Sequence, residues 1–305
     1  MTELSDIKAY FIGLQNSICK ALEEVDGKAK FLSDEWRRAD GGGGDTRVIQ
    51  DGAVFEKGGV NFSHVHGKLP EVIKSETRNA NYFHATGVSI VIHPHNPFVP
   101  IIHMNVRYFE MSEEENGPIS DAWFGGGIDL TPAYVIEEDG VFFHQAMKEA
   151  CDMHDTAYHP KFKKWCDDYF YIQHRKEMRG IGGIFFDHLR PNDNKTKADL
   201  FAFVQSVGNS FAPTYCEIVN RNKAKTYSDS NKEWQFIRRG RYAEFNLVYD
   251  RGTSFGLKTN GRIESILMSL PPQANWLYNH QPAKDSDEAK ALALFQPKEW
   301  GVSYV

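Results

Sequence analysis

Two neighbouring stretches of the chain gather chemically active side chains by a simple alternation of apolar and polar residues. Residues 87–93 and 101–109 both read as β-strands, and a strand places alternate side chains on opposite faces of its sheet. The polar set consists of Ser89, His93, His103, Asn105 and Arg107. Imidazoles titrate near neutral pH and a guanidinium binds carboxylates through two hydrogen bonds, so this set suits proton transfer beside an anionic ligand.

The pairing of the two strands decides how close these side chains lie. If the strands form a hairpin with His93 opposite His103, then Ser89 faces Arg107 and the whole polar set shares one small area. The alternative is that the polar face of an antiparallel hairpin is simply solvated. Solvated faces usually carry Lys, Glu and Thr, and this one has none, which favours a site.

A lone carboxylate follows a run of glycines in a third strand-like stretch, residues 123–132. Asp129 comes directly after Gly125–Gly127 and Ile128. Because glycine has no side chain, a large ligand could lie against this backbone with Asp129 reaching into it.

Arginines are concentrated around what reads as another hairpin, with strands at 241–250 and 253–258. The arginines are Arg238, Arg239, Arg241, Arg251 and Arg262. Their planar groups would suit a polyanionic ligand, although solvation at the surface explains most of them equally well. Arg262 precedes a predicted helix at 263–270, where backbone amides and a guanidinium could share one carboxylate.

Histidines also raise a metal hypothesis. His93 and His103, together with His144 or His174, would supply three or four nitrogen ligands. No HExxH or His-x-Asp motif supports such a site, and His103 can equally serve as a general acid or base. The sequence chemistry leaves both readings open.

Composition excludes several functional classes. The 305 residues are 41% hydrophobic and 25% charged, which is typical of a soluble globular protein. A net charge of -6 argues against a nucleic-acid partner, and no apolar run is long enough for a transmembrane segment. The four scattered cysteines predict a reducing compartment, and no signal peptide is evident, so we expect a cytoplasmic protein.

The remaining elements define an α+β class with a mainly antiparallel sheet and a single domain over residues 1–305. Further strands are predicted at 47–55, 59–66 and 180–189, and a flexible loop at Gly41–Gly44. Helices are predicted at 5–32, 141–155, 159–179, 199–219, 263–270 and 286–295.

Six long segments resemble the oxygen-dependent coproporphyrinogen III oxidases. They are GAVFEKGGVNFSHVHG (52–67), SIVIHPHNPFVPIIHMNVRYF (89–109), WFGGGIDLTP (123–132), HRKEMRGIGGIFFD (174–187), RRGRYAEFNLVYDRGTSFGL (238–257) and RIESILMSLPP (262–272). The resemblance implies a homodimer built on a large, flat antiparallel sheet between helices. It also implies conversion of two propionates of coproporphyrinogen III to vinyl groups, giving protoporphyrinogen IX in haem biosynthesis. Molecular oxygen would be the co-substrate, with no organic cofactor and an unsettled need for a divalent metal.

The resemblance also assigns roles to particular residues of this sequence. His103 matches the family's proposed proton donor, and Asp129 and Arg107 match the residues most often assigned to the chemistry. Substrate-contact positions are matched by Ser89, Asn105, Val106, Arg107, Asn260, Gly261 and Arg262, with Asn260 replacing a glycine of bacterial members. Metal ligands proposed for some bacterial members are matched by His93, His103, His144 and His174.

A four-propionate macrocycle fits this face chemically. We expect Arg107 and Arg262 to hold propionates and Asp129 to accept hydrogen bonds from pyrrole N–H groups. An electron-rich pyrrole can react with oxygen directly, so the protein would supply orientation and electrostatics. Two alternatives remain: a histidine-ligated, metal-dependent oxygenase acting on another carboxylate, and a non-catalytic tetrapyrrole-binding protein.

Overall fold

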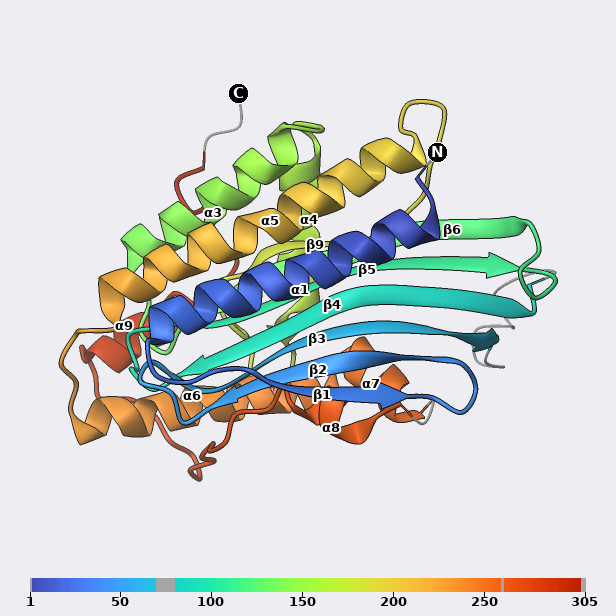
Figure 1. Cartoon of the computed structure of the whole chain (residues 1–305). Helices are drawn as coiled ribbons and strands as arrows, with labels where there is room; N and C mark the ends of the chain where they lie inside the picture. The colour runs from blue at the N-terminus through green and yellow to red at the C-terminus, as the bar shows by residue number, and fades with distance from the viewer. Residues whose placement is uncertain (1, 70–79, 259–260, 303–305) are drawn as a thin grey trace.

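The computed structural model describes residues 2–69, 80–258 and 261–302, and within them seven strands form one antiparallel sheet between helices (Figure 1). The strands lie in the order β1-β2-β3-β4-β5-β6-β9. They are β1 (Leu32–Arg37), β2 (Gly42–Gln50), β3 (Phe55–Lys68), β4 (Tyr82–Pro94), β5 (Ile101–Ser112), β6 (Ile119–Thr131) and β9 (Gly183–Leu189). The predicted α+β class and antiparallel sheet are therefore confirmed.

One face of the sheet is covered by two long helices, α1 (Leu4–Asp26) and α5 (Lys197–Asn222), as Figure 1 shows. Helix α1 buries one side chain every three or four residues, which makes a continuous apolar stripe. The stripe packs on the apolar parity of β4 and β5; the shared core includes Phe11, Leu14, Ile18, Val88, Ile90, Ile102, Met104 and Val106. Each such side chain contributes about 1.5–3 kcal/mol when fully buried. We call this side of the sheet the core face.

The opposite side of the sheet carries the polar parity of β4 and β5, and we call it the site face. Helices α6 (Asp229–Val248), α7 (Arg251–Lys258) and α8 (Ile263–Leu267) lie on this side (Figure 1). Tyr242 of α6 packs against Val91 and Ile101, so α6 covers the end of the site face where β4 and β5 join. The rest of this face carries partly exposed side chains.

The β9 edge of the sheet is wrapped by α4 (Tyr158–Tyr169), which follows α3 (Glu137–Asp152). Phe162 packs on Phe186 on the core face, with ring centroids 5.4 Å apart. Tyr169 stacks on Phe185 on the site face at 4.4 Å. The chain then forms a short hairpin, β7 (Tyr171–Ile172) and β8 (Glu177–Met178), beside β6; α9 (Asp287–Ala293) lies near the end of the chain. The predicted helix 159–179 is thus too long, because its second half is this hairpin.

Two other sequence predictions are wrong. Residues 241–248 and 253–258 are helical, in α6 and α7, and do not form a hairpin. Gly42–Gly44 belong to strand β2 and pair with β3, so the predicted loop at 41–44 is mostly strand. A Cβ on Gly44 would lie 2.6 Å from the Trp36 ring, so glycine at this position lets that ring lie flat on the strand. All four cysteines are free, and no helix among the described residues has the length and apolar character that crossing a lipid bilayer requires.

Asp26 at the end of α1 holds the turn between β2 and β3. Its carboxylate accepts backbone N–H bonds from Ala29, Ala53, Val54 and Phe55 at 2.8–3.0 Å. Burial alone would raise the pKa of Asp26, but these N–H groups outweigh it and lower the pKa to about 2. The carboxylate therefore stabilises the fold above the ordinary Asp pKa near 3.9, and this contribution is lost as pH falls through about 2.

Asp26→Asn should lower the free energy of unfolding by about 2–4 kcal/mol. Each carboxylate oxygen accepts from two of these N–H groups, and an amide nitrogen cannot accept, so at least two of them lose their partner at roughly 1–2 kcal/mol each. Urea unfolding at pH 7 should show a lower midpoint with an unchanged slope. Asp51→Asn is the matched control: Asp51 is exposed and has a φ of 53°, which asparagine tolerates, so about 0.5 kcal/mol or less is expected. Equal effects of the two changes would contradict this account of Asp26.

Candidate active site

The register of β4 and β5 places the polar side chains in a definite order on the site face. Val91 lies opposite His103, and Ser89 lies opposite Asn105. The predicted hairpin with His93 opposite His103 is therefore displaced by two residues. Pairing of β4 with β5 ends at Ile92, one residue before His93, because Pro94 has no N–H for this ladder; on its other side β4 still pairs with β3 as far as Pro94. The face that each residue occupies is as predicted, but the neighbours differ.

His103, Asp129 and Arg179 form the most tightly connected group on this face. His103 on β5 lies opposite Asp129 on β6, and its Nδ1 is 2.8 Å from Asp129 Oδ1. Arg179 Nη2 donates to both carboxylate oxygens, at 2.9 and 2.8 Å. The Asp129 side chain is 2% exposed, whereas that of His103 is 21% exposed. Both carboxylate oxygens therefore bind the protein, and only the imidazole reaches the surface of the site.

This geometry fixes the imidazole tautomer. A carboxylate can only accept, so His103 Nδ1 carries a proton and Nε2 is the nitrogen left for a substrate. Burial alone would raise the pKa of Asp129, but the charge of Arg179 and the hydrogen bond from His103 outweigh it and lower that pKa. Asp129 is therefore ionised near neutral pH and can stabilise a protonated His103. The group is arranged for proton transfer at Nε2.

Arg179 was not identified from the sequence. It follows β8, is 2% exposed, and its second amino group donates to Asn246 of α6 at 2.7 Å. The guanidinium carbon lies 4.1 Å from the Phe170 ring centroid and 4.8 Å from that of Phe245. A charged residue immediately before the glycine-rich strand 180–189 is the only local signal, and the partner is 50 residues away.

Arg107 is held flat on the site face by two acceptors. Its amino groups donate to Asn105 Oδ1 at 2.9 Å and to Asp187 Oδ2 of β9 at 2.7 Å. A Cβ on Gly125 would lie 2.4 Å from Asp187 Oδ1 and 2.9 Å from Arg107 Nε. Glycine at 125 therefore makes room for this ion pair, and not only for a ligand as expected. The Arg107 side chain remains 36% exposed and can still meet an anion.

Comparisons with known proteins identify the family of this chain. A family model described as coproporphyrinogen III oxidase matches residues 6–300. The chain is 51% identical over 297 residues to the protein of Glycine max named oxygen-dependent coproporphyrinogen-III oxidase, chloroplastic. The matched region covers 94% of this chain and 76% of that protein. The mitochondrial enzymes of the same name from Rattus norvegicus and Homo sapiens are 52% and 51% identical over 298 residues, covering 94% of this chain and 66% and 64% of theirs.

The chain belongs to the coproporphyrinogen III oxidase family. Within that family, the histidines matched to metal ligands do not come together in this member. His93 Nε2 donates to Ser269 O at 2.8 Å and His144 Nε2 to Ile181 O at 3.0 Å, and both rings are fully buried. His174 contacts Tyr249 and Glu244 instead. No group of three or more His, Cys, Asp or Glu residues in the described part of the chain is arranged to hold a metal.

The two buried histidines have structural roles. Burial lowers the pKa of both His93 and His144 to about 3, so both rings are neutral at physiological pH. The His93 ring meets Tyr242 edge-on at 5.4 Å, and its bond to Ser269 ties the segment after α8 to the sheet. The His144 ring is parallel to Trp300 at 5.8 Å.

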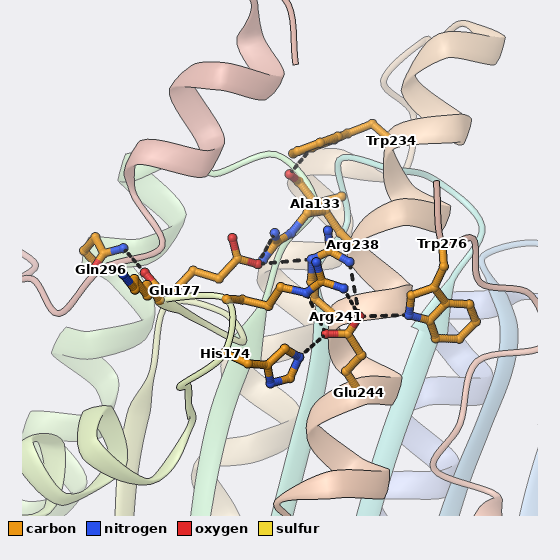
Figure 2. Close-up of polar contacts among 11 residues, drawn as sticks. Ala133, His174, Glu177, Trp234, Arg238, Arg241, Glu244, Trp276 and Gln296 are labelled. Carbon is orange, nitrogen blue, oxygen red and sulfur yellow. Dashed lines mark hydrogen bonds and ion pairs between the residues drawn. The ribbon is translucent and has the colours of Figure 1, made fainter. Parts of the chain in front are cut away.

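The arginines of α6 bind protein carboxylates, as Figure 2 shows for Arg238 and Arg241. Arg238 is buried and donates to Glu177 at 2.7 Å, and Arg241 lies between Glu177 and Glu244. Burial would raise the pKa of Glu244, but hydrogen bonds from Arg175 and His174 and the charge of Arg241 lower it to about 2. This network fastens α6 to the β7–β8 hairpin. It is neither a solvated surface nor a free polyanion site.

The other residues predicted to contact substrate lie in different positions relative to the site face. Arg262 precedes α8 and pairs with Asp34 of β1, so it lies at the far edge of the sheet from His103. Gly261 adjoins it, whereas Asn260 lies outside the described residues. The Val106 side chain is fully buried on the core face, so only its backbone borders the site face.

Proposed function

We propose that this chain is an oxygen-dependent coproporphyrinogen III oxidase of haem biosynthesis. The observation that carries the proposal is the match of about 51% identity, over 94% of the chain, to enzymes bearing that name. The activity would convert two propionates of coproporphyrinogen III to vinyl groups and yield protoporphyrinogen IX. Each propionic acid plus one O2 gives one vinyl group, one CO2 and one H2O2, so the two electrons that leave the β-carbon reduce the oxygen.

The site face suggests how the substrate is held. Arg107 lies on β5, and the partner of Arg262 lies on β1, four strand spacings or about 19 Å away. Two guanidinium groups at that separation suit propionates on opposite sides of one macrocycle. Ser89 and Asn105 lie between the two arginines on the same face and are partly exposed. We therefore assign substrate binding to Ser89, Asn105, Arg107 and Arg262, with the backbone at Val106 and Gly261. The resemblance adds Asn260, which lies outside the described residues.

The chemistry is assigned to His103, with Asp129 as its support. The expected direct contact of Asp129 with pyrrole N–H groups is not favoured, because both carboxylate oxygens already accept bonds from His103 and Arg179. His103 Nε2 would supply or accept the proton that moves as CO2 leaves, and Asp129 would stabilise the charged imidazole. The protein orients the propionate and manages protons while the pyrrole and oxygen exchange electrons. Oxygen is the co-substrate, and the proposal includes no organic cofactor.

One incubation separates this proposal from its rivals. Purified protein should release CO2 from coproporphyrinogen III in air and form the divinyl product, with equal rates in the presence and absence of a chelator. Loss of activity with chelator and its return with iron would favour the metal-dependent oxygenase. Binding of the porphyrinogen without CO2 release would favour the tetrapyrrole-binding protein. Binding without CO2 release contradicts the proposed activity, whereas an effect of chelator contradicts only turnover without a metal.

The domain organisation, oligomeric state and cellular compartment rest on less specific observations than the activity does. One core cluster contains residues from Ile7 to Trp300, which supports one domain over the chain. We infer a homodimer from the family resemblance, and the exposed side chains of Trp276, Leu277 and Tyr278 offer apolar surface for an interface. Sedimentation analysis measures the mass in solution, and a monomer would contradict the inference. The predicted cytoplasmic location gains no support from the relatives, whose names place them in chloroplasts or mitochondria.

A further inference from the structure

A row of polar side chains crosses the site face between the two arginines. Thr46 on β2 lies opposite Asn61 on β3. Asn61 in turn lies opposite Ser89 on β4, which pairs with Asn105 on β5. Directly opposed residues share a face, so these side chains stand in line at intervals of about 4.8 Å. Neither Thr46 nor Asn61 was predicted from the sequence to contact a substrate.

The hydrogen bonds at the β1 end of this row are all donated in the direction of Asn61. The Thr46 hydroxyl has one proton and gives it to Asn61 Oδ1 at 2.8 Å. Trp36 Nε1 donates to the same hydroxyl at 3.1 Å. Ser265 Oγ lies 2.7 Å from Thr46 Oγ1 and is the donor when the Thr46 proton goes to Asn61. Ser265 in turn accepts from Arg262 at 3.4 Å.

This chain of donors fixes the side-chain amide of Asn61. If the amide were reversed, Nδ2 would donate to Thr46 Oγ1 and the Thr46 proton would go to Ser265 Oγ. The proton of the buried Ser265 hydroxyl would then have no acceptor among the described residues. Asn61 Oδ1 therefore faces Thr46, and Nδ2 faces away from it. Within the described residues Nδ2 makes no hydrogen bond, and the side chain is partly exposed.

Asn105 is fixed in the same sense from the other end of the row. Its Oδ1 accepts from Arg107, which leaves Nδ2 without a partner among the residues described. Two amide N–H2 groups, on β3 and β5, are therefore presented as donors about 10 Å apart. Their ligand must offer acceptors, which a carboxylate does and a pyrrole N–H does not.

We propose that Asn61 is a substrate-binding residue whose amide nitrogen donates to a substrate carboxylate, and that Thr46 and Ser265 are positioning residues that hold this amide in its donor orientation. The inference rests on the proposed function, since it assumes a substrate with several carboxylates. It adds a neutral contact on β3 between the charged groups at either edge. The competing explanation is that Asn61 only joins β2 to β3, in which case its loss would affect stability and leave KM alone.

Asn61→Asp is the sharpest test, because it preserves shape and can still accept from Thr46 while replacing the donor with a negative charge. Losing a hydrogen bond to a charged group and adding repulsion should raise KM for coproporphyrinogen III roughly 10- to 100-fold, with kcat changed less than about 3-fold. Asn194→Asp adds the same charge at an exposed loop position and should leave both parameters unchanged. A wild-type KM in Asn61→Asp overturns the inference.

Thr46→Val and Thr46→Ser test the orientation independently. Valine removes the proton that fixes the amide and should raise KM roughly 3- to 10-fold, whereas serine keeps the hydroxyl and should restore the wild-type value. Thermal unfolding checks that each variant is folded. If Asn61→Asp does not fold, the KM values of the two Thr46 variants test the inference in its place. Equal KM values for the two Thr46 variants count against the inference. Failure of the wild-type protein to release CO2 would instead refute the proposed function.

Discussion

Replacement of His103 by asparagine should lower kcat roughly 10²- to 10⁴-fold and leave KM within a few-fold of the wild-type value. The asparagine amide nitrogen stands close to the position of Nδ1, so the hydrogen bond to Asp129 at 2.8 Å is retained. The change deletes Nε2, which is the nitrogen that the structure leaves for the substrate. Steady-state rates of CO2 release from coproporphyrinogen III measure the effect.

The pH profile distinguishes proton transfer from simple packing. If His103 moves a proton, the wild-type profile of kcat against pH should have a limb that is absent from the residual activity of His103→Asn. His280→Asn makes the same exchange at a histidine remote from Asp129 and should retain full activity. A fall in kcat below about 5-fold, or a limb that persists in the variant, would refute the assignment of His103.

Alternation in β4 and β5 was enough to place the site on one face of one sheet. Period-two patterns record burial directly, because each apolar residue such as Ile90 or Met104 marks the core face. Register is a different matter, since it depends on where pairing stops. Pro94 ends the ladder, and His93 reaches Ser269, 176 residues further along the chain. Neither the register nor that distant partner can be read from the local pattern.

Helix α6 was mistaken for a strand because its buried side is partly polar. Gln235, Arg238, Arg239 and Asn246 are buried beside apolar residues such as Trp234, Ile237 and Phe245, so the apolar repeat of 3.6 residues is interrupted. Their partners, such as Glu177 for Arg238, lie in other elements and are invisible to sequence periodicity. The β-prone residues of 241–250 then favoured the wrong class. Tertiary pairing of charges overrode local propensity here.

Charge pairing also explains why one of the three members of the His103, Asp129 and Arg179 group was missed. Asp129 was found because a carboxylate in a glycine-rich strand is conspicuous. Arg179 was not, because its significance depends on contacts with Asp129 and Asn246, 50 and 67 residues away. A buried arginine in an aromatic enclosure has no sequence signature of its own. The contribution of this residue can nevertheless be measured.

Arg179→Met should lower the free energy of unfolding by about 3–5 kcal/mol, because it leaves the buried carboxylate of Asp129 without its cation. Methionine fills much of the space between the rings of Phe170 and Phe245, so the loss reports on charge more than on a cavity. Urea unfolding at pH 7 measures it. Lys164→Met removes an exposed cation from a surface pair and should cost about 1 kcal/mol or less.

If Arg179 stabilises the protein through its ion pair with Asp129, two further results are expected for Arg179→Met. Without Arg179, burial should raise the pKa of Asp129, so the folded state takes up a proton more readily than the unfolded chain. The deficit relative to wild type should then be full at pH 8 and smaller at pH 5. Adding Asp129→Asn removes the stranded charge, and the double variant should regain about 1–2 kcal/mol over Arg179→Met alone. Strictly additive losses, or a deficit independent of pH, would show that Arg179 stabilises the site through packing and not through the charge of Asp129.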